Sequence, residues 1–409
     1  MAEPEYPVRI GLEQALEIVG ARAAQHRLPV ETGDLADAQD RVLAEDMRAP
    51  HPLPPFANSA MDGFALRGGD LPAQGERTFA LIGEVFAGAD SAPPIGAGEC
   101  VRITTGAPLP PGADTVVIKE NVVVDGDSIT AKAGEKLHAN VRAAGEDYME
   151  GVIAIASGTW LRAPQLAVLA ALGIAHVPVR RRPRVAVIAT GNELVPAGQP
   201  LAFGQIHESN AVMLASLARE AGAMVVARRC VRDDPEALRE ALLDAALEAD
   251  VIVTSGGVSA GEADHLPRVL ATVGDIHFHK VRLKPGMPTL FGQIGACLHF
   301  GLPGNPVASA VTFRVFAGFA LRAMLGVTQV PKPSCARLAA PVHKRHARAE
   351  LARCSLHTDE QGTQWAMPHA KQGSGMLRGL AESGALALLP ADAHEFAKGD
   401  VVMLWPEYF

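Results

Sequence analysis

The sequence predicts a multidomain α/β protein whose central part is a doubly wound, mostly parallel sheet. A chain of 409 residues is too long to fold around a single core. From Arg184 to about Leu325, apolar runs typical of buried strands alternate with helical runs. Short β-like runs separated by turn residues flank this part on both sides. We therefore expect the α/β domain to lie between a β-rich lobe and a C-terminal β-barrel-like domain.

The N-terminal part is expected to combine helices with the β-rich lobe. The run LEQALEIVGARAAQ has helical periodicity, and a second helix is expected around Leu35 to Glu45. Residues 51–142 are rich in Gly and Pro and contain β-like runs such as TFALIGEVF and TVVIKENVVV. The apolar stretch from Ala163 to Val179 is too interrupted to span a membrane, and we interpret it as a buried helix. The expected domains are residues 1–50 with 143–180, then 51–142, 181–330 and 331–409.

The central part has the most regular pattern. Expected strands are RVAVIAT, MVVARRCV, DVIVTS, IHFHKVRL, PTLFGQI and ACLHFGL. Expected helices are SNAVMLASLAREAGA, DDPEALREALLDAALEA with Asp234 as cap and Pro235 in its first turn, and a long helix from Asn305 to about Leu325. Beyond about Pro331 come the short runs CARLAAPV, ELARCSL, QWAMPHA, GALALLP and DVVMLW. Ligands of such α/β sheets bind beyond the carboxyl ends of the strands, so the site is expected there.

Composition and charge argue against several classes of protein. A net charge of -8 disfavours a general nucleic-acid binder, although the basic run RRRPR leaves open an RNA contact or a solvated interdomain segment. The N-terminus MAEPEYPVRI does not resemble a signal peptide, so we expect a cytoplasmic protein without membrane contact. Five dispersed cysteines predict reduced core thiols. The histidines of HFH and HKRH leave a metal site open, but strand and surface histidines are commoner.

Four loops follow expected strands and should open onto one edge of the sheet: ATGNEL, SGGVSAGEAD, KPGMP and GLPGNP. Gly256 and Gly257 allow backbone N–H groups to approach an anion, with Ser255 and Ser259 as further donors. Asn305 can cap the long helix and leave its N-terminal dipoles free for an anion. Tight strand-to-helix turns would explain either glycine loop equally well.

Charged residues beside these loops favour an oxyanion site with a metal. Alternation in KVRLK places Lys280, Arg282 and Lys284 on one face, either as edge protection or as an anion site. Unscreened acids would repel a phosphate there by about 4 kcal/mol per close pair of charges. A Mg²⁺ ion between carboxylates and phosphates reverses this repulsion, so Mg²⁺ is the expected cofactor. The acids concerned are Glu193, Glu208, Glu262 and Asp264.

Seven motifs together identify a family. They are PPFANSAMDGFA, RITTGAPLPPGAD, GEDY, ATGNEL, SGGVSAGEAD, KPGMP and LPGNPVAS. In this order they resemble the molybdopterin molybdenumtransferases, the MoeA family, which includes the E domain of gephyrin. The resemblance covers nearly the whole chain and is far more specific than any one loop.

The resemblance implies both an architecture and a reaction. It implies an elongated N-terminal region and a homodimer, with the active site between one subunit's α/β domain and the other's N-terminal lobes. Members insert molybdenum from molybdate into adenylylated molybdopterin and release AMP with the help of Mg²⁺. Contact with the molybdopterin adenylyltransferase and with molybdoenzymes stays open.

The family's functional residues can be carried over by position. The resemblance implies catalytic roles for Asp62, Glu193, Asp264 and Lys284, and metal binding by Glu193, Glu208 and Asp264. Asp264 takes precedence over Glu262 as the acid that holds the metal. Cofactor or oxyanion binding is implied for Thr105, Asp147, Ser255, Gly256, Gly257, Ser259, Lys280, Pro288, Asn305, Arg348 and Ser374.

The sequence departs from the family pattern at several positions. Met287 stands where the second lysine of KPGKP is usual, which removes a cation and predicts weaker oxyanion binding. The other departures are Glu208 for the aspartate of DSN, Ala57 for that of DNSAMDG, Asn192 for that of GDEL, and Ala308 for the serine after GNPV.

Two alternative functions fit parts of the pattern. An enzyme like the molybdopterin adenylyltransferase shares the α/β module but lacks the NSAMDG lobe and the C-terminal β domain, both present here. A non-catalytic scaffold of the gephyrin type need not keep Asp62, Asp264 and Lys284. Because the chain has all three, the enzyme is the favoured interpretation.

Overall fold

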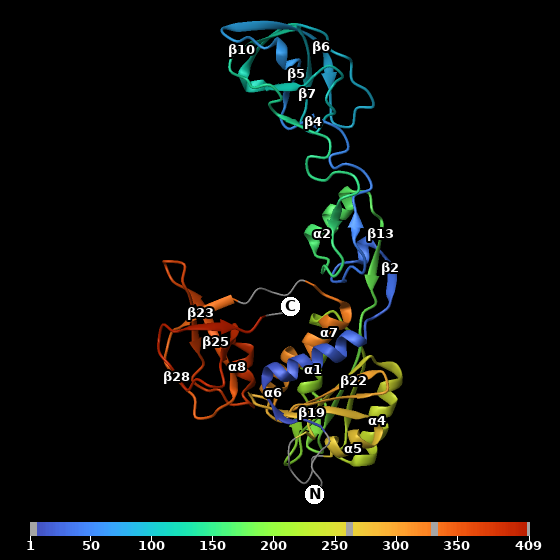
Figure 1. The fold of residues 1–409 in the computed structure, drawn as a ribbon, viewed down its shortest axis with the longest axis vertical. Helices are drawn as coiled ribbons and strands as arrows, with labels where there is room; N and C mark the ends of the chain where they lie inside the picture. Colours follow the sequence, from blue (N-terminus) through green and yellow to red (C-terminus); the bar gives the residue numbers. More distant parts are fainter. Residues whose placement is uncertain (1–5, 259–264, 329–333, 407–409) are drawn as a thin grey trace.

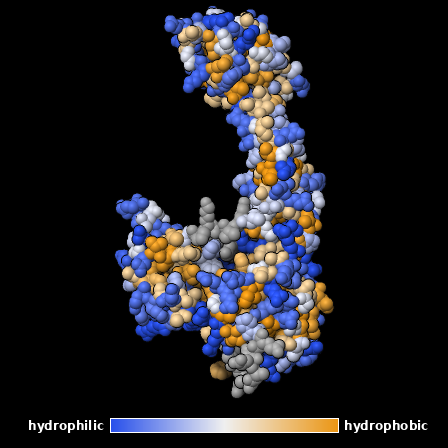
Figure 2. Space-filling model, in the orientation of Figure 1, coloured by the Kyte–Doolittle hydropathy of each residue, from blue (hydrophilic) through white to orange (hydrophobic). Residues whose placement is uncertain are grey.

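The computed structural model describes residues 6–258, 265–328 and 334–406. Figure 1 shows an elongated chain with a β-rich lobe at one end, a narrow connection, and two packed domains at the other end. Polar and apolar residues are mixed over the face visible in Figure 2. The expected multidomain α/β fold, with its elongated N-terminal region, is confirmed.

The α/β domain contains a seven-stranded sheet in the order β1-β19-β21-β22-β18-β14-β17. β21 runs antiparallel to both of its neighbours, and the other pairings in the sheet are parallel. The strands that run in the common direction therefore end at the same edge, where the four predicted loops follow them. The bounds are β1 Val8–Ile10, β14 Arg184–Thr190, β17 Met224–Val231, β18 Val251–Ser255, β19 Asp275–Val281, β21 Leu290–Ile294 and β22 Cys297–Leu302.

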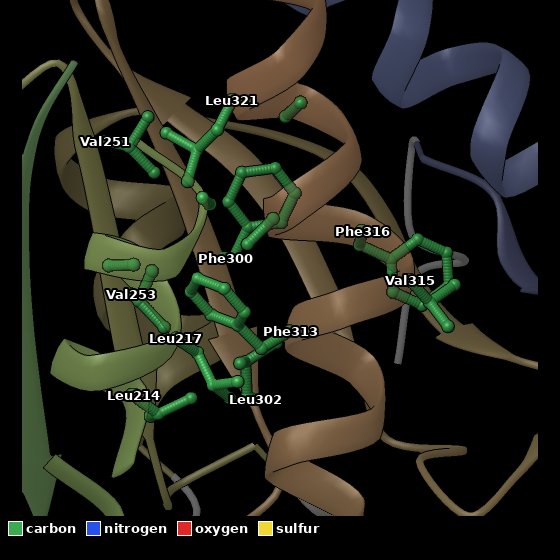
Figure 3. Close-up of a cluster of buried hydrophobic side chains, with 14 of the residues drawn as sticks. Leu214, Leu217, Val251, Val253, Phe300, Leu302, Phe313, Val315, Phe316 and Leu321 are labelled. Atoms are coloured by element: carbon green, nitrogen blue, oxygen red, sulfur yellow. The ribbon is translucent and has the colours of Figure 1, made fainter. Parts of the chain in front are cut away.

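Helices cover both faces of this sheet because its strands are apolar on both sides. Val251 and Val253 face one core and Ile252 faces the other, as strand geometry requires. Figure 3 shows the first core, where Phe300 and Leu302 of β22 pack with Phe313. This face is covered by α1 Leu12–Gln25, α3 Asn210–Glu220, α6 Pro306–Thr312 and α7 Gly318–Leu325, and the other by α4 Pro235–Glu248 and α5 Leu266–Val273.

The long C-terminal helix of this domain is interrupted by a π turn at Phe313–Ala317, between α6 and α7. The whole segment Pro306–Leu325 is long and apolar enough to cross a membrane. Because 78% of its most apolar window is buried inside the protein, it is a core helix of the α/β domain. Asp234 caps α4 as predicted, since its side chain accepts hydrogen bonds from the amides of Glu236 and Ala237.

Two segments of the chain, residues 30–59 and 141–180, run side by side and connect the α/β domain to the lobe. Three short antiparallel pairs join the two segments: β2 Val30–Asp34 with β13 His176–Arg180, β3 Met47–Arg48 with β12 Ile153–Ile155, and β4 Asn58–Ser59 with β11 Val141–Arg142. The basic run RRRPR lies at the base of this connection. Arg181 forms two 2.9 Å hydrogen bonds with Asp250, and Arg180 donates to the carbonyl of Leu28. These contacts agree with an interdomain segment.

Two helix predictions in the connection were wrong. The stretch from Leu35 to Glu45 has only a 3₁₀ turn at Leu35–Asp37, because Val42 and Leu43 form bridges with Trp160 and Val179 instead. The stretch from Ala163 to Val179 is not one buried helix. α2 spans Ala163–Ala171 with only Leu169 fully buried, and the chain turns at Gly173, with φ +71°, into β13.

The lobe and the C-terminal domain are each built on six strands. The lobe sheet has the order β8-β5-β7-β6-β10-β9, with β5 Gly63–Leu66, β6 Glu76–Val85, β7 Glu99–Ile103, β8 Thr115–Ile118, β9 Val122–Asp125 and β10 Ser128–Lys132. The C-terminal order is β20-β25-β26-β23-β29-β27, and the pairing of β25 with β27 closes a five-stranded barrel. Its strands are β20 Leu283–Lys284, β23 Ser334–Leu338, β25 Ala349–Thr358, β26 Gln364–Pro368, β27 Ala385–Leu389 and β29 Val401–Leu404.

The run IHFHKVRL is not one strand, contrary to prediction. β19 ends at Val281, and β20 leaves the α/β sheet to pair with β25 of the C-terminal barrel. Lys280 has a positive φ of 67°, which interrupts regular strand geometry just before this switch. Lys280 and Lys284 therefore belong to different sheets.

All five cysteines are free thiols, as predicted. Cys100, Cys297 and Cys354 are buried, and burial raises the pKa of Cys100 and Cys297 to about 12 and that of Cys354 to about 11. Cys230 and Cys335 are exposed, so the expectation of core thiols was wrong for these two.

Candidate functional site

A cleft of about 470 Å³ opens at the carboxyl edge of the α/β sheet. All four predicted loops contribute to its walls, which confirms that they share one edge. The walls include Thr190, Gly191 and Glu193, then Ser255 to Val258, Pro288, and Pro303 to Pro306. Three loops come from β14, β18 and β22, which are neighbours in the sheet.

The glycine loop after β18 has a backbone that a larger residue could not adopt. Gly256 has a φ of +102°, and a Cβ at this position would lie 2.6 Å from the carbonyl oxygen of Thr190. Gly257 also has a positive φ, of 67°. The two glycines thus leave the backbone at the cleft without covering side chains, although the amide of Gly256 itself donates to the carbonyl of Leu302 at 3.1 Å.

Ser255 lines the cleft but is 2% exposed, and its hydroxyl is committed to the protein. It accepts a 2.8 Å hydrogen bond from the side-chain amide of Asn210 and lies 3.4 Å from the carbonyl of Pro303, to which it donates. The same amide of Asn210 donates to the carbonyl of Gly304 at 2.6 Å. Asn210 therefore ties the glycine loop to the PGNP loop.

Asn210 is a wall residue that the sequence interpretation missed. The sequence pattern predicts only that Asn210 belongs to a helix, and it lies in the first turn of α3. Its position directly after Glu208 and Ser209, at the same edge as the four loops, was the available signal.

Two carboxylates, those of Glu193 and Glu208, line the cleft. β15 Leu194–Val195 pairs in parallel with β16 Ile206–His207, and Glu193 lies just before β15 while Glu208 lies just after β16. Glu193 is exposed, whereas one oxygen of Glu208 accepts a 2.6 Å hydrogen bond from the amide of Ala211 in α3. Both acids also act on Cys230, whose pKa is raised by burial first and then by these two charges.

The carboxylates of Glu193 and Glu208 suit a hard cation, although Asp264, the third predicted metal ligand, lies outside the described residues. Glu193 and Glu208 offer only oxygen ligands, which fits Mg²⁺. Within residues 6–258, 265–328 and 334–406, no group of three or more histidine, cysteine or acidic side chains could hold a metal. Ser259, Glu262 and Asp264 lie outside the described residues.

Asn305 occupies the N-cap position of α6, but its side chain makes no capping hydrogen bond, contrary to expectation. The side chain is exposed at the cleft wall. The amide of Val307 instead donates to the carbonyl of Ser374 at 2.9 Å. A loop of the C-terminal barrel thus supplies the hydrogen-bond acceptor for one amide at the start of α6. This contact places Ser374 at the edge of the cleft.

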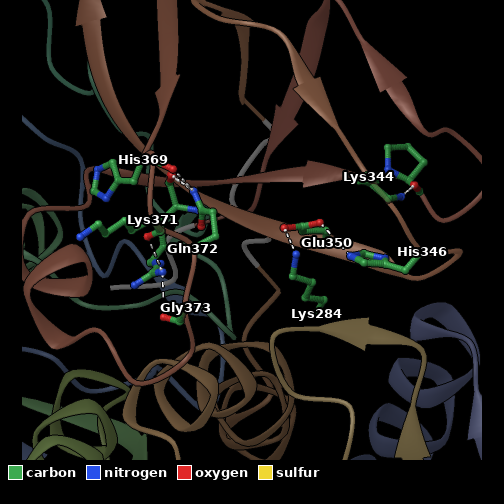
Figure 4. A network of polar contacts seen from close by, with 10 residues as sticks. Lys284, Lys344, His346, Glu350, His369, Lys371, Gln372 and Gly373 are labelled. Atoms are coloured by element: carbon green, nitrogen blue, oxygen red, sulfur yellow. Dashed lines mark hydrogen bonds and ion pairs between the residues drawn. The ribbon is translucent and has the colours of Figure 1, made fainter.

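Lys284 lies in an ion-pair network at the junction of the two domains (Figure 4), not among the residues that line the cleft. Its Nζ is 3.0 Å from one oxygen of Glu350, and Nε2 of His346 is 3.1 Å from the other oxygen. Glu350 is buried, and the adjoining Lys344, also buried, donates to the carbonyl of Pro390. The pKa of His346 is lowered by burial first and then by the charge of Arg348, which places Arg348 near this network. Lys280 is likewise absent from the cleft lining.

The lobe residues form a separate group. One oxygen of Asp62 accepts hydrogen bonds from both the amide and the hydroxyl of Thr105, each at 2.9 Å, and Lys119 lies 3.6 Å from the other oxygen. The backbone bond from Thr105 is the largest cause that lowers the pKa of Asp62. Asp147 lines a different hollow, with Asn58 and Arg142. In a single chain, the lobe lies far from the α/β cleft (Figure 1).

Three family models match consecutive parts of the chain. The MoeA N-terminal region matches residues 10–173, a probable molybdopterin binding domain matches residues 186–323, and the MoeA C-terminal region matches residues 335–406. The chain belongs to the MoeA family. In this family's terms, the four loops of the cleft lie within the molybdopterin-binding region, and Arg348 and Ser374 within the C-terminal region.

Relatives in the MoeA family match this chain over most of their length. A protein of Haemophilus influenzae named molybdopterin molybdenumtransferase is 35% identical over 91% of this chain and 93% of its own. One of Mycobacterium tuberculosis, named molybdopterin molybdenumtransferase 2, is 36% identical over 91% of this chain and 94% of its own. The crystal structure of a MoeA protein from Pyrococcus horikoshii superposes with a TM-score of 0.82 at 28% identity, covering 97% of this chain and all of that one.

Proposed function

We propose that this protein is a molybdopterin molybdenumtransferase. It would take adenylylated molybdopterin and molybdate, transfer molybdenum to the dithiolene and release AMP. The observation that carries the proposal is the match to molybdenumtransferases at 35% identity over 91% of the chain. The cleft agrees with it, because a glycine loop and two carboxylates at one sheet edge suit a phosphorylated substrate with its metal ion.

The wall residues of the cleft divide into two tasks. Gly257 would offer its amide to the phosphate or pterin end, and the missing side chain of Gly256, whose own amide donates to Leu302, would let the substrate approach the loop closely. Asn210 would keep the two opposing loops at a fixed distance through its bonds to Ser255 and Gly304. This preorganised wall would orient the adenylylated substrate and exclude part of its water.

Glu193 and Glu208, together with Asp264, would hold Mg²⁺ at the phosphoanhydride. When bound, the ion would neutralise the charge that develops on the departing AMP. One oxygen of Glu208 holds the amide of Ala211, and the other makes no hydrogen bond within the described part of the chain and could serve this task. The carboxylates themselves keep the substrate phosphates at a distance until the cation is present.

The molybdate end of the site would lie toward the C-terminal barrel. Ser374 reaches the start of α6, and Arg348 adds a cation near the Lys284 network. Asp62, Thr105 and Asp147 would come from the lobe of a second subunit in a homodimer, because their own lobe lies far from the cleft. We expect the protein in the cytoplasm, where contact with the adenylyltransferase and with molybdoenzymes would transfer the intermediates.

The test combines purified protein with adenylylated molybdopterin, molybdate and Mg²⁺. We expect molybdate-dependent AMP release and activation of a molybdenum-free apoenzyme. Asp264→Ala should abolish turnover without dissociating the dimer. Asp244→Ala should leave turnover unchanged, because Asp244 is an exposed acid of α4 that pairs with Arg229 of β17. Absence of molybdate-dependent AMP release by the unaltered protein would rule out the proposal.

A further inference from the structure

Arg353 is a buried arginine enclosed by one loop of the C-terminal barrel. It lies on β25, is 1% exposed, and contacts backbone carbonyls through its guanidinium. Hydrogen bonds run from it to the carbonyls of Lys371, Gly373 and Met376 at 3.1, 3.0 and 3.1 Å. Among the described residues, no carboxylate forms an ion pair with it. Burial of a charged guanidinium that only carbonyls hydrogen-bond has a large desolvation penalty, so a role beyond stability is expected for this side chain.

The loop 371–376 is fixed to Arg353 a second time through Gln372. The side chain of Gln372 accepts a hydrogen bond from the amide of Arg353 at 3.1 Å and donates to its carbonyl at 2.9 Å. It also donates to the carbonyl of His369 at 3.0 Å. Figure 4 shows His369, Lys371, Gln372 and Gly373 gathered at this point. The conformation of the loop is therefore determined from within the barrel.

This arrangement directs the loop toward the cleft. In a planar trans peptide, the C=O and N–H groups point in opposite directions. Because the carbonyl of Gly373 points at Arg353, the amide of Ser374 points away from it. The carbonyl of Ser374 accepts the amide of Val307 at 2.9 Å, which docks the loop on the start of α6 beside Asn305. Ser374 thus lies between the buried cation and the cleft.

We infer that Arg353 is a positioning residue for the oxyanion, acting through Ser374. Its three carbonyl bonds hold the loop so that the amide and hydroxyl of Ser374 face the anion. The bond to Gly373 also polarises the peptide whose N–H belongs to Ser374 and strengthens that donor. The inference rests on the proposed function, in which Ser374 contacts molybdate.

The test compares Arg353→Met with Arg337→Met, a matched control. Arg337 belongs to the same barrel and also donates to a carbonyl, that of Gly399, but is exposed. For Arg353→Met we expect the KM for molybdate and the Kd for molybdate alone to rise about tenfold. The KM for adenylylated molybdopterin should stay unchanged, and Arg353→Lys should restore part of the molybdate affinity. The control should match the unaltered protein in all these measurements.

A double-mutant cycle with Ser374→Ala separates positioning from a merely structural role. If Arg353 acts through Ser374, the loss of molybdate affinity in the double variant should be smaller than the sum of the two single losses, because Ser374→Ala already removes the hydroxyl while keeping the amide. Independent, additive losses would overturn the inference, as would an unchanged molybdate KM in folded Arg353→Met. If Arg353→Met does not fold, Arg353→Lys replaces it in the cycle with the same two outcomes, because an ammonium group cannot span three carbonyls in the same geometry. An inactive unaltered protein would instead refute the proposed function.

Discussion

His299 should make the stability of the α/β domain depend on pH. It lies on β22 in the middle of the sheet, has no exposed surface, and has Nε2 3.3 Å from the hydroxyl of Thr254. Its Nδ1 has no hydrogen-bond partner among the described residues. Burial lowers the pKa of His299 from 6.5 to about 3, so the folded protein keeps this ring neutral. We predict that His299→Gln reduces the acid sensitivity of this sheet.

The magnitude follows from the difference between the two pKa values. The unfolded chain protonates His299 below pH 6.5, whereas the folded chain does so only near pH 3. The stabilisation is therefore complete above pH 6.5 and is lost as the pH falls toward 3. The loss is about 1.4 kcal/mol per pH unit, or about 2 kcal/mol of unfolding free energy at pH 5. Glutamine has no such equilibrium but can still reach the hydroxyl of Thr254.

Hydrogen exchange measured by mass spectrometry can follow this sheet separately from the other domains. Opening free energies of amides in β18 and β22 should fall more steeply with acid in the unaltered protein than in His299→Gln. Below pH 6, the slope of opening free energy against pH should differ between the two proteins by about 1.4 kcal/mol per pH unit, which corresponds to the uptake of one proton. His207→Gln, which removes an exposed histidine of the same domain, should leave the slope unchanged. Equal slopes for His299→Gln and the unaltered protein would refute the reasoning.

Three further substitutions test local features. Glu350→Ala leaves Lys284 and His346 without their shared carboxylate and should lower the urea unfolding free energy of the barrel by about 2 kcal/mol. The loss stays below that of a fully buried ion pair because solvent screens the partly exposed Lys284. Glu382→Ala, which breaks an exposed pair, should change this free energy by less than about 0.5 kcal/mol. Gly286→Ala places a Cβ 2.1 Å from a threonine methyl at a φ of +111° and should reduce the Tm several times more than Gly126→Ala, which meets open space. Met287→Lys should lower the calorimetric Kd for molybdate about tenfold, and an unchanged Kd would show that this position does not contact the anion.

The sequence predicted the α/β domain well because its signals are local. The strand runs RVAVIAT and DVIVTS each contain consecutive apolar residues, at 185–189 and 251–253, as burial on both faces requires. The glycine loop was predictable for a similar reason, since the φ of Gly256 is a property that almost no other residue can supply. Parallel strand order then placed the four loops at one edge without further information.

The errors occurred where a distant partner determined the outcome. β20 follows β19 directly in sequence, but pairing with β25 draws it into another sheet. Val42 and Leu43 lie in a segment with helical periodicity, yet bridges to Trp160 and Val179 keep it extended. β1 has only three residues and no alternation long enough to detect. None of these pairings leaves a trace in local sequence.

The chemistry of single side chains was the least predictable part of the site. KVRLK indicated a cationic strand but not that Lys284 would pair with buried Glu350. Asn305 stands at the right position for a cap, but the carbonyl of Ser374 from another domain satisfies the amide of Val307. Side-chain partners depend on distances of a few ångströms between segments that are remote in sequence, which residue spacing alone does not encode.

The distance between Asp62 and the α/β cleft leads to a final prediction about assembly. Asp62 is held at the surface of the lobe by two hydrogen bonds from Thr105, and the paired connection keeps that lobe away from its own cleft. A reaction that uses both regions therefore requires the lobe of another copy. A homodimer with two-fold symmetry would form two equivalent composite sites.

Mixed dimers distinguish this arrangement from a site within one chain. Subunits carrying Asp62→Ala and Asp264→Ala, each with its own affinity tag, would be purified as a heterodimer. If sites form between subunits, the cleft of the first variant meets the intact lobe of the second, and about half of the AMP release returns. If sites form within a subunit, both sites lack one carboxylate and the heterodimer is as inactive as either parent. Asp62→Asn in place of alanine keeps the side-chain size, so a loss of activity there traces to the charge.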